Sequence, residues 1–561
     1  MTALADLDVL VIDCQATGAS PAFGRVLELG WGVVRGSAPA PFSAEAHWIA
    51  LPAGHAVPSE VRKLTGYEPA FAADAIADHD AWDRLRHAAS TAAAVPTAIH
   101  YARFELSFLR EWSARFEPET PFPLDAVCVH AIARRLYPEL PRQTIRALAG
   151  YLGYSLDLTR RALGHVEATA FVWQRLVSEL AERGVTSWSE LGAFLTTRAS
   201  SPPRGQKPKY PILPERYRSL PDAPGVYRFL RRNGDVLYVG KAASLKKRTS
   251  SHFIGRASKA LAPEMLTQVS DIAVTVVASA LEAALLENET IKALAPPYNV
   301  QLTTSDTSAW YATPAFDAAA VVPDERHSVG PLPAEYSLRP LGALAELIAG
   351  ASPTARLRSD VVGVSALFTP DELVFLAGWA ELAARHRELG APGAAHPRKS
   401  ALALARRLLA ATATKPDDEA PSETTEDSPN RNWDPARVAR HVERAAAQAY
   451  RAYRRAHFLR LVHNSDVVFR EPEAAQARLL RIRGGILAEA ASATFAHAPE
   501  QRVRPHGLHP PPRFDRATYD RLRILTTELK RIVRDGGEVA VHFGPRRRLP
   551  ERLLAGVLRV V

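Results

Sequence analysis

Four side chains in the middle of the chain could together carry out acid–base chemistry on a phosphate ester: Tyr227, Tyr238, Arg248 and Glu287. A positioned phenol can accept or relay a proton, and a guanidinium binds phosphate oxygens. A carboxylate is a ligand that hard divalent cations prefer. Together these residue types could form a site for a cation and an anionic group.

The local sequence predicts how the two tyrosines are held. Residues 225–230 alternate in polarity as a strand does, and Asn233-Gly234 is a strong two-residue hairpin turn. Residues 235–240 then form the returning strand. Tyr227 and Tyr238 are thus expected on neighbouring strands, facing one cleft.

Helical spacing follows the hairpin and returns further along the chain. Over residues 241–248 it would place Lys241, Leu245 and Arg248 on one helix face. Residues 281–299 read as a helix followed by a proline-terminated turn. Glu287 falls on the mostly apolar side of that helix, where a carboxylate needs a metal or a cation.

These residues resemble the GIY-YIG nuclease family, and in particular the incision domain of UvrC and its shorter relative Cho. The matching elements are Gly225-Val226-Tyr227, Tyr238-Val239-Gly240, the Gly-Lys-Ala-x-x-Leu-x-x-Arg run from Gly240 to Arg248, Glu287, and Pro-x-Tyr-Asn from Pro296 to Asn299. Taken one at a time, the elements have simpler explanations. The tyrosines could be core aromatics, the basic residues a solvated helix face, and Glu287 an ordinary acid of a helix. Their occurrence in order favours the nuclease.

The resemblance implies a DNA endonuclease that makes a single nick with 5′-phosphate and 3′-hydroxyl products. Glu287 would bind one Mg²⁺ or Mn²⁺. Either tyrosine could act as the base, provided that Lys241 or the metal lowers the pKa of the phenol. The residues expected to act in catalysis are Tyr227, Tyr238, Lys241, Arg248, Glu287 and Asn299, and those expected to grip the DNA backbone are Lys246 and Lys247.

The first 195 residues predict an α/β domain. Apolar runs at 9–12 and 26–31 are typical of buried strands. The helical patterns that follow cover residues 103–115, 125–136, 143–152 and 165–182. Strands first and helices later indicate helices packed on a sheet.

Four segments of this domain resemble the DnaQ-like (DEDDh) 3′–5′ exonucleases, which implies a ribonuclease H-like fold. They are residues 11–18, 60–66, 100–109 and 160–170. Of the four metal carboxylates in the family pattern, the chain has Asp13 and a longer Glu105. Gln15 and His165 occupy the other two positions, and Arg160 replaces the general-base histidine. Because that chemistry needs acids around two metals, we expect a degenerate exonuclease domain.

Two alternatives remain open for this cleft. Neighbouring Glu28 or Glu167 could substitute for the missing acids. Alternatively, Arg160 and His165 make the cleft less negative, so it could bind a DNA phosphate without cutting it.

The expected domain organisation follows from two linker-like stretches. Residues 196–211 are rich in proline and charge, and residues 411–431 are acidic and lack large apolar side chains, which is typical of disorder. A mostly helical UvrC-like extension would occupy residues 301–410. A basic α+β domain of no recognised family would occupy residues 432–561, beginning with an arginine-rich helix that carries Tyr450 and Phe458 and continuing with strands near 466–470 and 479–488.

Composition sets limits on these predictions. Lys and Arg number 70 against 60 acids, giving +10, and seven of the eleven lysines fall between residues 207 and 292. Two cysteines exclude a Cys₄ metal site or a disulfide scaffold. The sequence has no apolar run of the roughly 18 residues that a membrane helix needs.

The sequence thus predicts a cytoplasmic, nucleoid-associated bacterial endonuclease. Its DNA repair pathway would resemble nucleotide excision repair, with damaged or branched duplex DNA as the partner and no membrane. A loader of the UvrA/UvrB type is left open. The alternatives are an active 3′–5′ exonuclease with an accessory nicking domain, and a noncatalytic DNA-binding repair scaffold.

Overall fold

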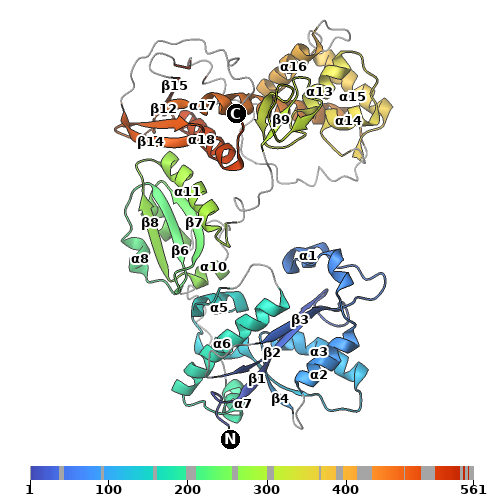
Figure 1. Ribbon diagram of the computed structural model, residues 1–561, viewed down its shortest axis with the longest axis vertical. Helices are drawn as coiled ribbons and strands as arrows, with labels where there is room; N and C mark the ends of the chain where they lie inside the picture. The colour runs from blue at the N-terminus through green and yellow to red at the C-terminus, as the bar shows by residue number, and fades with distance from the viewer. Residues whose placement is uncertain are drawn as a thin grey trace. The chain divides into compact units, whose positions relative to one another are not determined.

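The computed structural model divides into two compact units, residues 1–303 (unit 1) and residues 304–561 (unit 2) (Figure 1). Both units combine helices and sheets, so the chain is a mixed α/β protein of several domains. The described residues are 2–36, 43–89, 94–155, 161–197, 210–254, 263–299, 309–365, 368–386, 396–412, 433–472, 474–493, 512–543, 548–549 and 554.

A five-stranded sheet of order β3-β2-β1-β4-β5 organises the N-terminal region of unit 1. Its strands are β1 (Asp8–Ala16), β2 (Val26–Arg35), β3 (Ala44–Trp48), β4 (Val95–Ile99) and β5 (Leu124–Cys128). Strand β1 lies at the centre, antiparallel to β2 and parallel to β4. The two predicted strands at 9–12 and 26–31 are confirmed.

Helices bury both faces of this sheet (Figure 1). They are α1 (Ser59–Thr65), the 3₁₀ helix η1 (Pro69–Ala73), α2 (Asp78–Ala88), α3 (Ala102–Phe116), α4 (Val129–Leu136), α5 (Ile145–Leu152), α6 (Ala162–Glu182) and α7 (Trp188–Thr196). Val9 and Val11 join the core formed with α4–α7, whereas Leu10 and Ile12 join the core formed with α2 and α3. Burial on both sides explains why β1 is apolar without alternation.

The predicted helix over residues 125–136 is wrong in its first part. Residues up to Cys128 belong to β5, which pairs in parallel with β4, and α4 begins only at Val129. A buried strand leading directly into an amphipathic helix has no polar break between them, so the apolar pattern does not mark the boundary.

The central region of unit 1 has a three-stranded sheet of order β7-β6-β8. Its elements are α8 (Pro214–Arg218), β6 (Gly225–Leu230), β7 (Val236–Ala242), α9 (Leu245–Phe253), α10 (Pro263–Gln268), β8 (Asp271–Val276) and α11 (Ala280–Leu294). The predicted hairpin is confirmed: β6 and β7 are antiparallel, and Gly234 has the positive φ of 90° that its turn requires.

The predicted helix over residues 241–248 begins later than expected. Lys241 lies in β7, and Ser244 caps α9 by accepting a hydrogen bond from the Lys247 N–H. Lys241 therefore does not share a helix face with Arg248.

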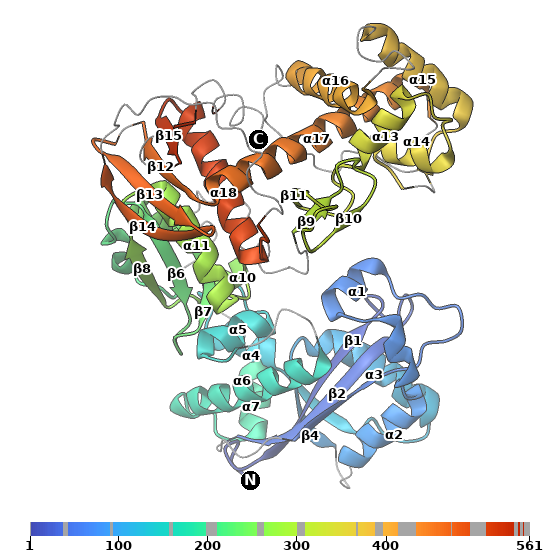
Figure 2. The ribbon, with the colours of Figure 1, turned by 45° about the horizontal axis from the view of Figure 1, so that its top comes forward.

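Helices dominate the first half of unit 2, as expected for residues 301–410. A small sheet of order β10-β9-β11 precedes five helices. The elements are β9 (Trp310–Ala312), β10 (Ala319–Ala320), β11 (Val329–Leu332), α13 (Arg339–Ile348), α14 (Ala355–Val362), α15 (Glu372–Arg385), α16 (Pro397–Thr412) and α17 (Pro435–Val462). Figure 2 shows α13–α16 gathered along the first part of the long helix α17, with which they share a core.

The second half of unit 2 has a four-stranded sheet of order β14-β13-β12-β15. Its elements are β12 (Ser465–Arg470), β13 (Ala477–Arg483), β14 (Ile486–Ala493), α18 (Arg516–Arg534) and β15 (Glu538–His542). The single strand predicted over residues 479–488 is wrong, because Gly484 and Gly485 turn the chain there with φ of 59° and 75°.

Two stretches predicted as linkers lie largely outside the described residues. Helix α7 ends at Thr196 and α16 runs to Thr412, so each helix enters the predicted linker by one or two residues. The domain boundaries drawn from composition stay a prediction. In the parts of the chain that the structure describes, no helix is both long and apolar enough to cross a membrane.

Candidate active site

The two predicted tyrosines come together on the β6–β7 hairpin. Tyr227 on β6 lies opposite Gly240, Tyr238 on β7 lies opposite Phe229, and the two tyrosine ring centroids are 6.1 Å apart. A Cβ atom at Gly240 would lie only 2.5 Å from the Tyr227 hydroxyl oxygen. Glycine in the Tyr-Val-Gly triplet therefore leaves the space that the Tyr227 side chain fills.

A histidine that the sequence analysis missed completes this pair. The Tyr227 hydroxyl lies 2.8 Å from Nε2 of His252 on α9, and both side chains are buried. Arg248, one turn earlier on α9, is exposed, and its charge lowers the pKa of Tyr227. Leu245, Thr249 and His252 follow i, i+4, i+7 spacing and are the buried residues of α9. That stripe is the sequence signal that could have identified His252.

Burial sets the protonation of these groups. It raises the pKa of Tyr227 and of Tyr238, and the charge of Glu287 raises both further, while Arg248 acts in the opposite direction. Burial and, secondarily, Arg248 lower the pKa of His252 to about 4. At neutral pH both phenols are therefore protonated and His252 is a neutral imidazole.

The expectation that Lys241 or the metal lowers the pKa of a phenol stays a prediction. The Lys241 side chain is exposed at the end of β7, and the charge of Arg248 lowers the pKa of both tyrosines. The main chain of Lys241 has a different role, because its N–H donates a 2.8 Å hydrogen bond to Oε1 of Glu287.

Glu287 lies on the side of α11 that the sequence predicted. Ala283, Ala284 and Ile291, the neighbours at −4, −3 and +4, are all buried, and the Glu287 side chain is half-buried. The bond from Lys241 directs the carboxylate to the end of β7, so Glu287 and the tyrosines share one edge of the sheet.

Asn299 supports the site from behind. Its side-chain oxygen accepts a bond from Val239 N–H, and its Nδ2 donates to Val239 O, each at 2.8 Å. This clamp fixes the β7 backbone next to Tyr238. These contacts fit a role of Asn299 in holding β7, and the catalytic role expected for Asn299 stays a prediction.

The two lysines expected to grip DNA lie on the exposed side of α9. Lys246 and Lys247 are both exposed beside Arg248, and Lys247 forms an ion pair of 3.6 Å with Asp222. Their position next to the tyrosines fits contact with a nucleic-acid backbone, which is the role predicted for them.

The donor set of this site fits a magnesium-like ion better than a transition metal. Within the described ranges, no group of three or more His, Cys, Asp and Glu side chains could hold a metal. Mg²⁺ suits such a site, because it keeps several waters and binds proteins through one or two carboxylates together with substrate phosphates. Glu287 is the carboxylate that could hold it.

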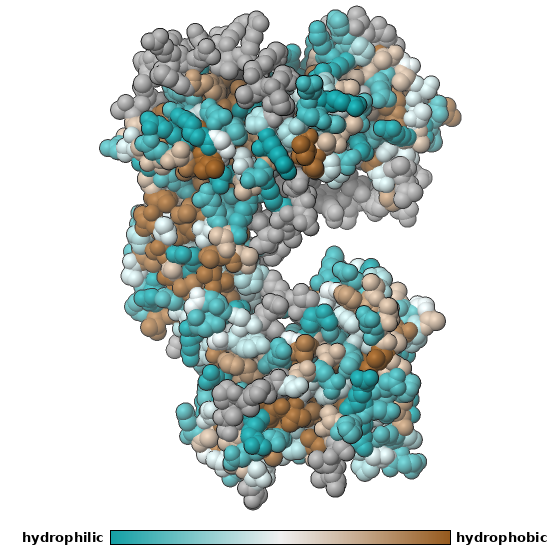
Figure 3. Space-filling view, viewed as in Figure 1, coloured by the Kyte–Doolittle hydropathy of each residue, from teal (hydrophilic) through white to brown (hydrophobic). Residues whose placement is uncertain are grey.

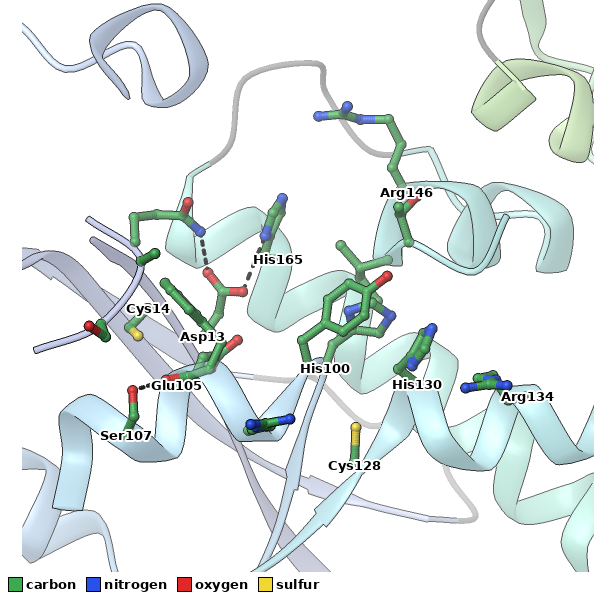
Figure 4. A pocket seen from close by; sticks show the side chains of 18 of the residues that line it. Asp13, Cys14, His100, Glu105, Ser107, Cys128, His130, Arg134, Arg146 and His165 are labelled. Carbon is green, nitrogen blue, oxygen red and sulfur yellow. Dashed lines mark hydrogen bonds and ion pairs between the residues drawn. The ribbon is translucent and has the colours of Figure 1, made fainter. Parts of the chain in front are cut away.

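The N-terminal cleft, lined by Asp13, Gln15, Glu105 and His165, is arranged differently (Figure 4). Gln15 Nε2 donates to Oδ2 of Asp13 at 2.7 Å, and His165 Nδ1 lies 3.1 Å from Oδ1 of Asp13. Both carboxylate oxygens of Asp13 are thus held by the side chains that replace two acids of the exonuclease pattern. His165, predicted to contact phosphate, is buried and bonded to Asp13.

Glu105 sits at the bottom of the same cavity, which has a volume of about 920 Å³. Its side chain is buried, and its Oε2 has no hydrogen-bond partner among the described residues. Burial, and then the charge of Asp13, raises the pKa of Glu105 well above its usual range. Burial and the neighbouring Asp13 carboxylate therefore disfavour the ionised form of Glu105 in this cleft.

The two acids that could have substituted are not available in this cleft. Glu28 is buried, accepts the Ala162 N–H at 2.9 Å and is paired with Arg161 at 2.8 Å. Glu167 is exposed and does not line the cavity. Arg160 lies outside the described residues.

Comparison with known proteins defines the central region first. Residues 223–300 match the UvrC-like GIY-YIG domain, which is the family that the sequence resembled there. This match includes the hairpin, Arg248, His252, Glu287 and Asn299.

Particular relatives extend the comparison. A Mycobacterium tuberculosis protein named as a bifunctional exonuclease/endonuclease is 32% identical over 249 residues, which are 44% of this chain and 36% of that protein. The UvrABC system protein C of Alkalilimnicola ehrlichii is 50% identical over 93 residues, 17% of this chain and 15% of the relative. The chain thus spans well under half the length of these curated relatives.

A solved structure also matches the central region. It is the N-terminal GIY-YIG endonuclease domain of UvrC from Thermotoga maritima bound to magnesium, 29% identical, with a TM-score of 0.14. The match covers 15% of this chain and 92% of that chain.

Proposed function

We propose that the chain is a metal-dependent DNA endonuclease whose active site consists of Tyr227, Tyr238, Arg248, His252 and Glu287. The observation that carries the proposal is the convergence of two phenols, a guanidinium and a carboxylate at one edge of the β6–β7 hairpin. Residues 223–300 match a nuclease domain, which supports the same conclusion.

Glu287 would hold one divalent cation, Mg²⁺ or Mn²⁺, in this site. When bound, the ion supplies positive charge that stabilises the scissile phosphate and the leaving 3′ oxygen. The chain's contribution is to fix the carboxylate by the Lys241 N–H and to present Arg248 to a non-bridging phosphate oxygen. Cleavage of the P–O3′ bond by water would leave a 5′-phosphate and a 3′-hydroxyl.

The Tyr238 and Tyr227 rings are 6.1 Å apart and the Tyr227 hydroxyl lies 2.8 Å from Nε2 of His252, so the three side chains would give the proton of the attacking water a path. Water transfers a proton to the Tyr238 oxygen, the Tyr238 proton passes to Tyr227, and the Tyr227 proton passes to Nε2 of His252. Arg248 disfavours protonated His252. A phosphate bound by Arg248 would neutralise that repulsion, so substrate binding favours the transfer.

The N-terminal region is, in this proposal, a ribonuclease H-like exonuclease fold without exonuclease activity. Its strand order and its four family-like segments support the fold. The bonds from Gln15 and His165 to Asp13, together with buried Glu105, argue against two metals there. The active-exonuclease alternative is therefore the weaker one, and the intact tyrosine site argues against a purely noncatalytic scaffold.

The substrate we propose is damaged or branched duplex DNA, nicked once in a repair pathway similar to nucleotide excision repair. A relative named UvrABC system protein C supports that setting. A loader of the UvrA/UvrB type would then bring the enzyme to its site.

Nicking of an end-labelled duplex containing a lesion, with Mg²⁺ or Mn²⁺, tests the proposal. Glu287→Gln should lower the nicking rate by at least about 100-fold, the loss seen when one major transition-state interaction is removed. Asp13→Asn is the matched control, because it alters a carboxylate of the other cleft, and it should leave nicking unchanged.

Two results would contradict the proposal. Cutting that persists in Glu287→Gln at the wild-type rate would exclude Glu287 as the metal-binding residue. A ladder of products shortened from the 3′ end, lost in Asp13→Asn, would instead establish the exonuclease alternative.

A further inference from the structure

We propose that unit 2 contains a binding groove for single-stranded DNA, formed between α17 and the α13–α14 pair. The groove has a volume of about 1300 Å³ and lies outside residues 223–300, which match the GIY-YIG domain. Its floor is the part of α17 beside which α13 and α14 pack (Figure 2). We call it the α17 groove.

The first observation is its charge. Four arginines line the α17 groove, namely Arg339, Arg356, Arg437 and Arg444, and Asp360 is the only acid among the described lining residues. Arg356 is 81% exposed beside Asp360. A net positive concave surface of this kind attracts the phosphates of a nucleic-acid backbone.

The polar residues of α17 form a stripe that follows the groove. Arg437, His441, Arg444 and Gln448 are spaced three or four residues apart, so they lie along one side of the helix. The stripe is about 16 Å long at the usual rise per residue. Cationic and polar groups repeated along a line suit an extended chain of phosphates better than one isolated anion.

The second observation is a pair of exposed aromatic rings in the same groove. Tyr336 is 66% exposed and Phe368 is 46% exposed, and both belong to the groove lining. Large aromatic side chains lose favourable burial when they face water. Rings combined with arginines in a groove are the arrangement on which unpaired bases stack.

The groove is held in shape by Trp433. Its Nε1 donates a 2.8 Å hydrogen bond to the carbonyl oxygen of Phe368, which fixes the backbone that presents the Phe368 ring. Arg437 lies 4.7 Å above the Trp433 ring, and His441 contacts it edge-on at 4.9 Å. These contacts orient the α17 stripe and the Phe368 loop together.

Two aromatic residues of α17 named in the sequence analysis do not line the groove. Tyr450 and Phe458 are buried in the protein core. The stacking side chains come from the segments around α13 and α14 instead, where the sequence showed no arginine–aromatic pattern. Figure 3 shows that the visible surface of the α13–α16 region is largely hydrophilic or pale, so its exposed rings are local features.

The choice of a single strand follows from the rings. In a duplex the faces of the bases are stacked on one another. A protein then reaches the phosphates, the sugars and the edges of the bases, but not the base faces. Only an unpaired strand offers base faces to Tyr336 and Phe368. An acidic peptide would satisfy the arginines but would not require the aromatic pair.

Fluorescence anisotropy of a labelled dT₁₅ oligonucleotide, titrated with the full chain in EDTA, tests this site without cleavage. Tyr336→Ala/Phe368→Ala should weaken binding by about tenfold or more, the loss expected for stacked bases. Phe368→Trp should keep most of the affinity. Arg437→Glu/Arg444→Glu should weaken binding and reduce its dependence on salt.

Arg440→Glu is the matched control, because Arg440 is exposed on α17 but does not line the groove. It should change binding by less than twofold. A blunt duplex hairpin of the same charge should be affected little by the aromatic substitutions. Since no readout depends on nicking, the result is independent of the proposed nuclease activity.

Three results would overturn the site. The aromatic variant, shown to be folded by circular dichroism, could bind dT₁₅ as wild type does. Polyglutamate could displace dT₁₅ from wild type and bind the aromatic variant undiminished, which would identify a surface for acidic peptides. Photocrosslinking of an iodouracil oligonucleotide to the wild-type chain could label neither Tyr336 nor Phe368.

Discussion

Two carboxylates of unit 1, Asp13 and Glu287, occupy sites predicted from similar phosphodiester chemistry, yet the protein holds them in opposite ways. The oxygens of Asp13 are engaged by the side chains of Gln15 and His165. Oε1 of Glu287 is engaged by a main-chain N–H of β7. A main-chain donor orients a carboxylate whatever the side-chain sequence, whereas the donors to Asp13 are side chains at two positions where the exonuclease pattern has acids.

The titratable groups around the two carboxylates also differ. Around Asp13, the acid Glu105 is buried and its pKa is raised. Near Glu287 lie two phenols and neutral His252, with the Tyr227 hydroxyl 2.8 Å from Nε2 of His252. The two carboxylates thus differ in their hydrogen-bond partners, and similarity of fold and motif order alone does not fix the chemistry of a site.

The largest expected effect concerns the proton path of the tyrosine site. Tyr238→Phe should lower the single-turnover nicking rate by about 10²- to 10⁴-fold, the range for loss of a general base. Tyr227→Phe should cost less, about tenfold or more, because Tyr238 remains but its link to His252 is lost. Rapid-quench measurement of nicking with saturating Mg²⁺ separates the two rates.

A wild-type rate in Tyr238→Phe would exclude Tyr238 as the group that accepts the water's proton. A larger loss in Tyr227→Phe than in Tyr238→Phe would reverse the assignment of base and relay. Lys241→Ala is a useful companion, since Lys241 contacts Glu287 through its main chain and the substitution should change the rate little.

A smaller but informative effect comes from converting the N-terminal cleft toward the acidic pattern. Gln15→Glu/His165→Asp removes both donors to Asp13 and adds like charges beside it. In EDTA the free energy of unfolding should fall by about 2–4 kcal/mol, because a buried carboxylate loses its hydrogen bonds. Mn²⁺ should recover much of that loss, as measured by thermal melting with and without the ion.

Ser178→Asp controls for added charge, because it places a carboxylate on the exposed side of the same helix α6. Its melting temperature should not respond to Mn²⁺. If wild type were stabilised by Mn²⁺ through Asp13 as strongly as the double variant, Gln15 and His165 could not be replacing the metal.

How far the sequence predicted these two sites depends on how local each signal is. The Asn233-Gly234 turn and the strand alternation around it are local, so the tyrosine hairpin was predicted correctly. The bond between Asp13 and His165 joins residues 152 positions apart, and only the folded sheet and α6 bring them together. Residue types showed which acids were missing, but not what the remaining acid would bind.

Local sequence patterns also gave wrong element boundaries where the same pattern fits both a helix and a strand. The apolar residues before α4 fit a helix or a buried strand, and parallel pairing with β4 decided for the strand. Lys241 fitted the helical spacing of α9 but was taken into β7 by pairing with Val226. His252 was overlooked because its importance comes from burial against Tyr227, which the sequence does not display.

The smallest expected effect over a single pH unit is a pH dependence of stability, which tests the protonation of Glu105. Burial raises its pKa in the native state above the usual 4.5. Between pH 4.5 and that raised value the native state holds a proton that the unfolded state has lost. Wild type therefore loses stability as pH rises through this range, by up to about 1.4 kcal/mol per pH unit.

Glu105→Gln has no such proton to lose, so its stability relative to wild type should increase with pH above about 4.5, where unfolded Glu105 begins to ionise, and stay level below. Thermal melting of both proteins from pH 4 to pH 8 measures the difference in stability. Glu111→Gln is the control for removal of a surface charge, because Glu111 is half-exposed on the same helix α3. A difference that shrinks with rising pH would mean that native Glu105 is ionised and stabilised as an anion. In that case both sites would contain an ionised acid besides their differences in geometry. Asp13 and Glu287 would then differ only in their hydrogen-bond partners, which for Asp13 are Gln15 and His165.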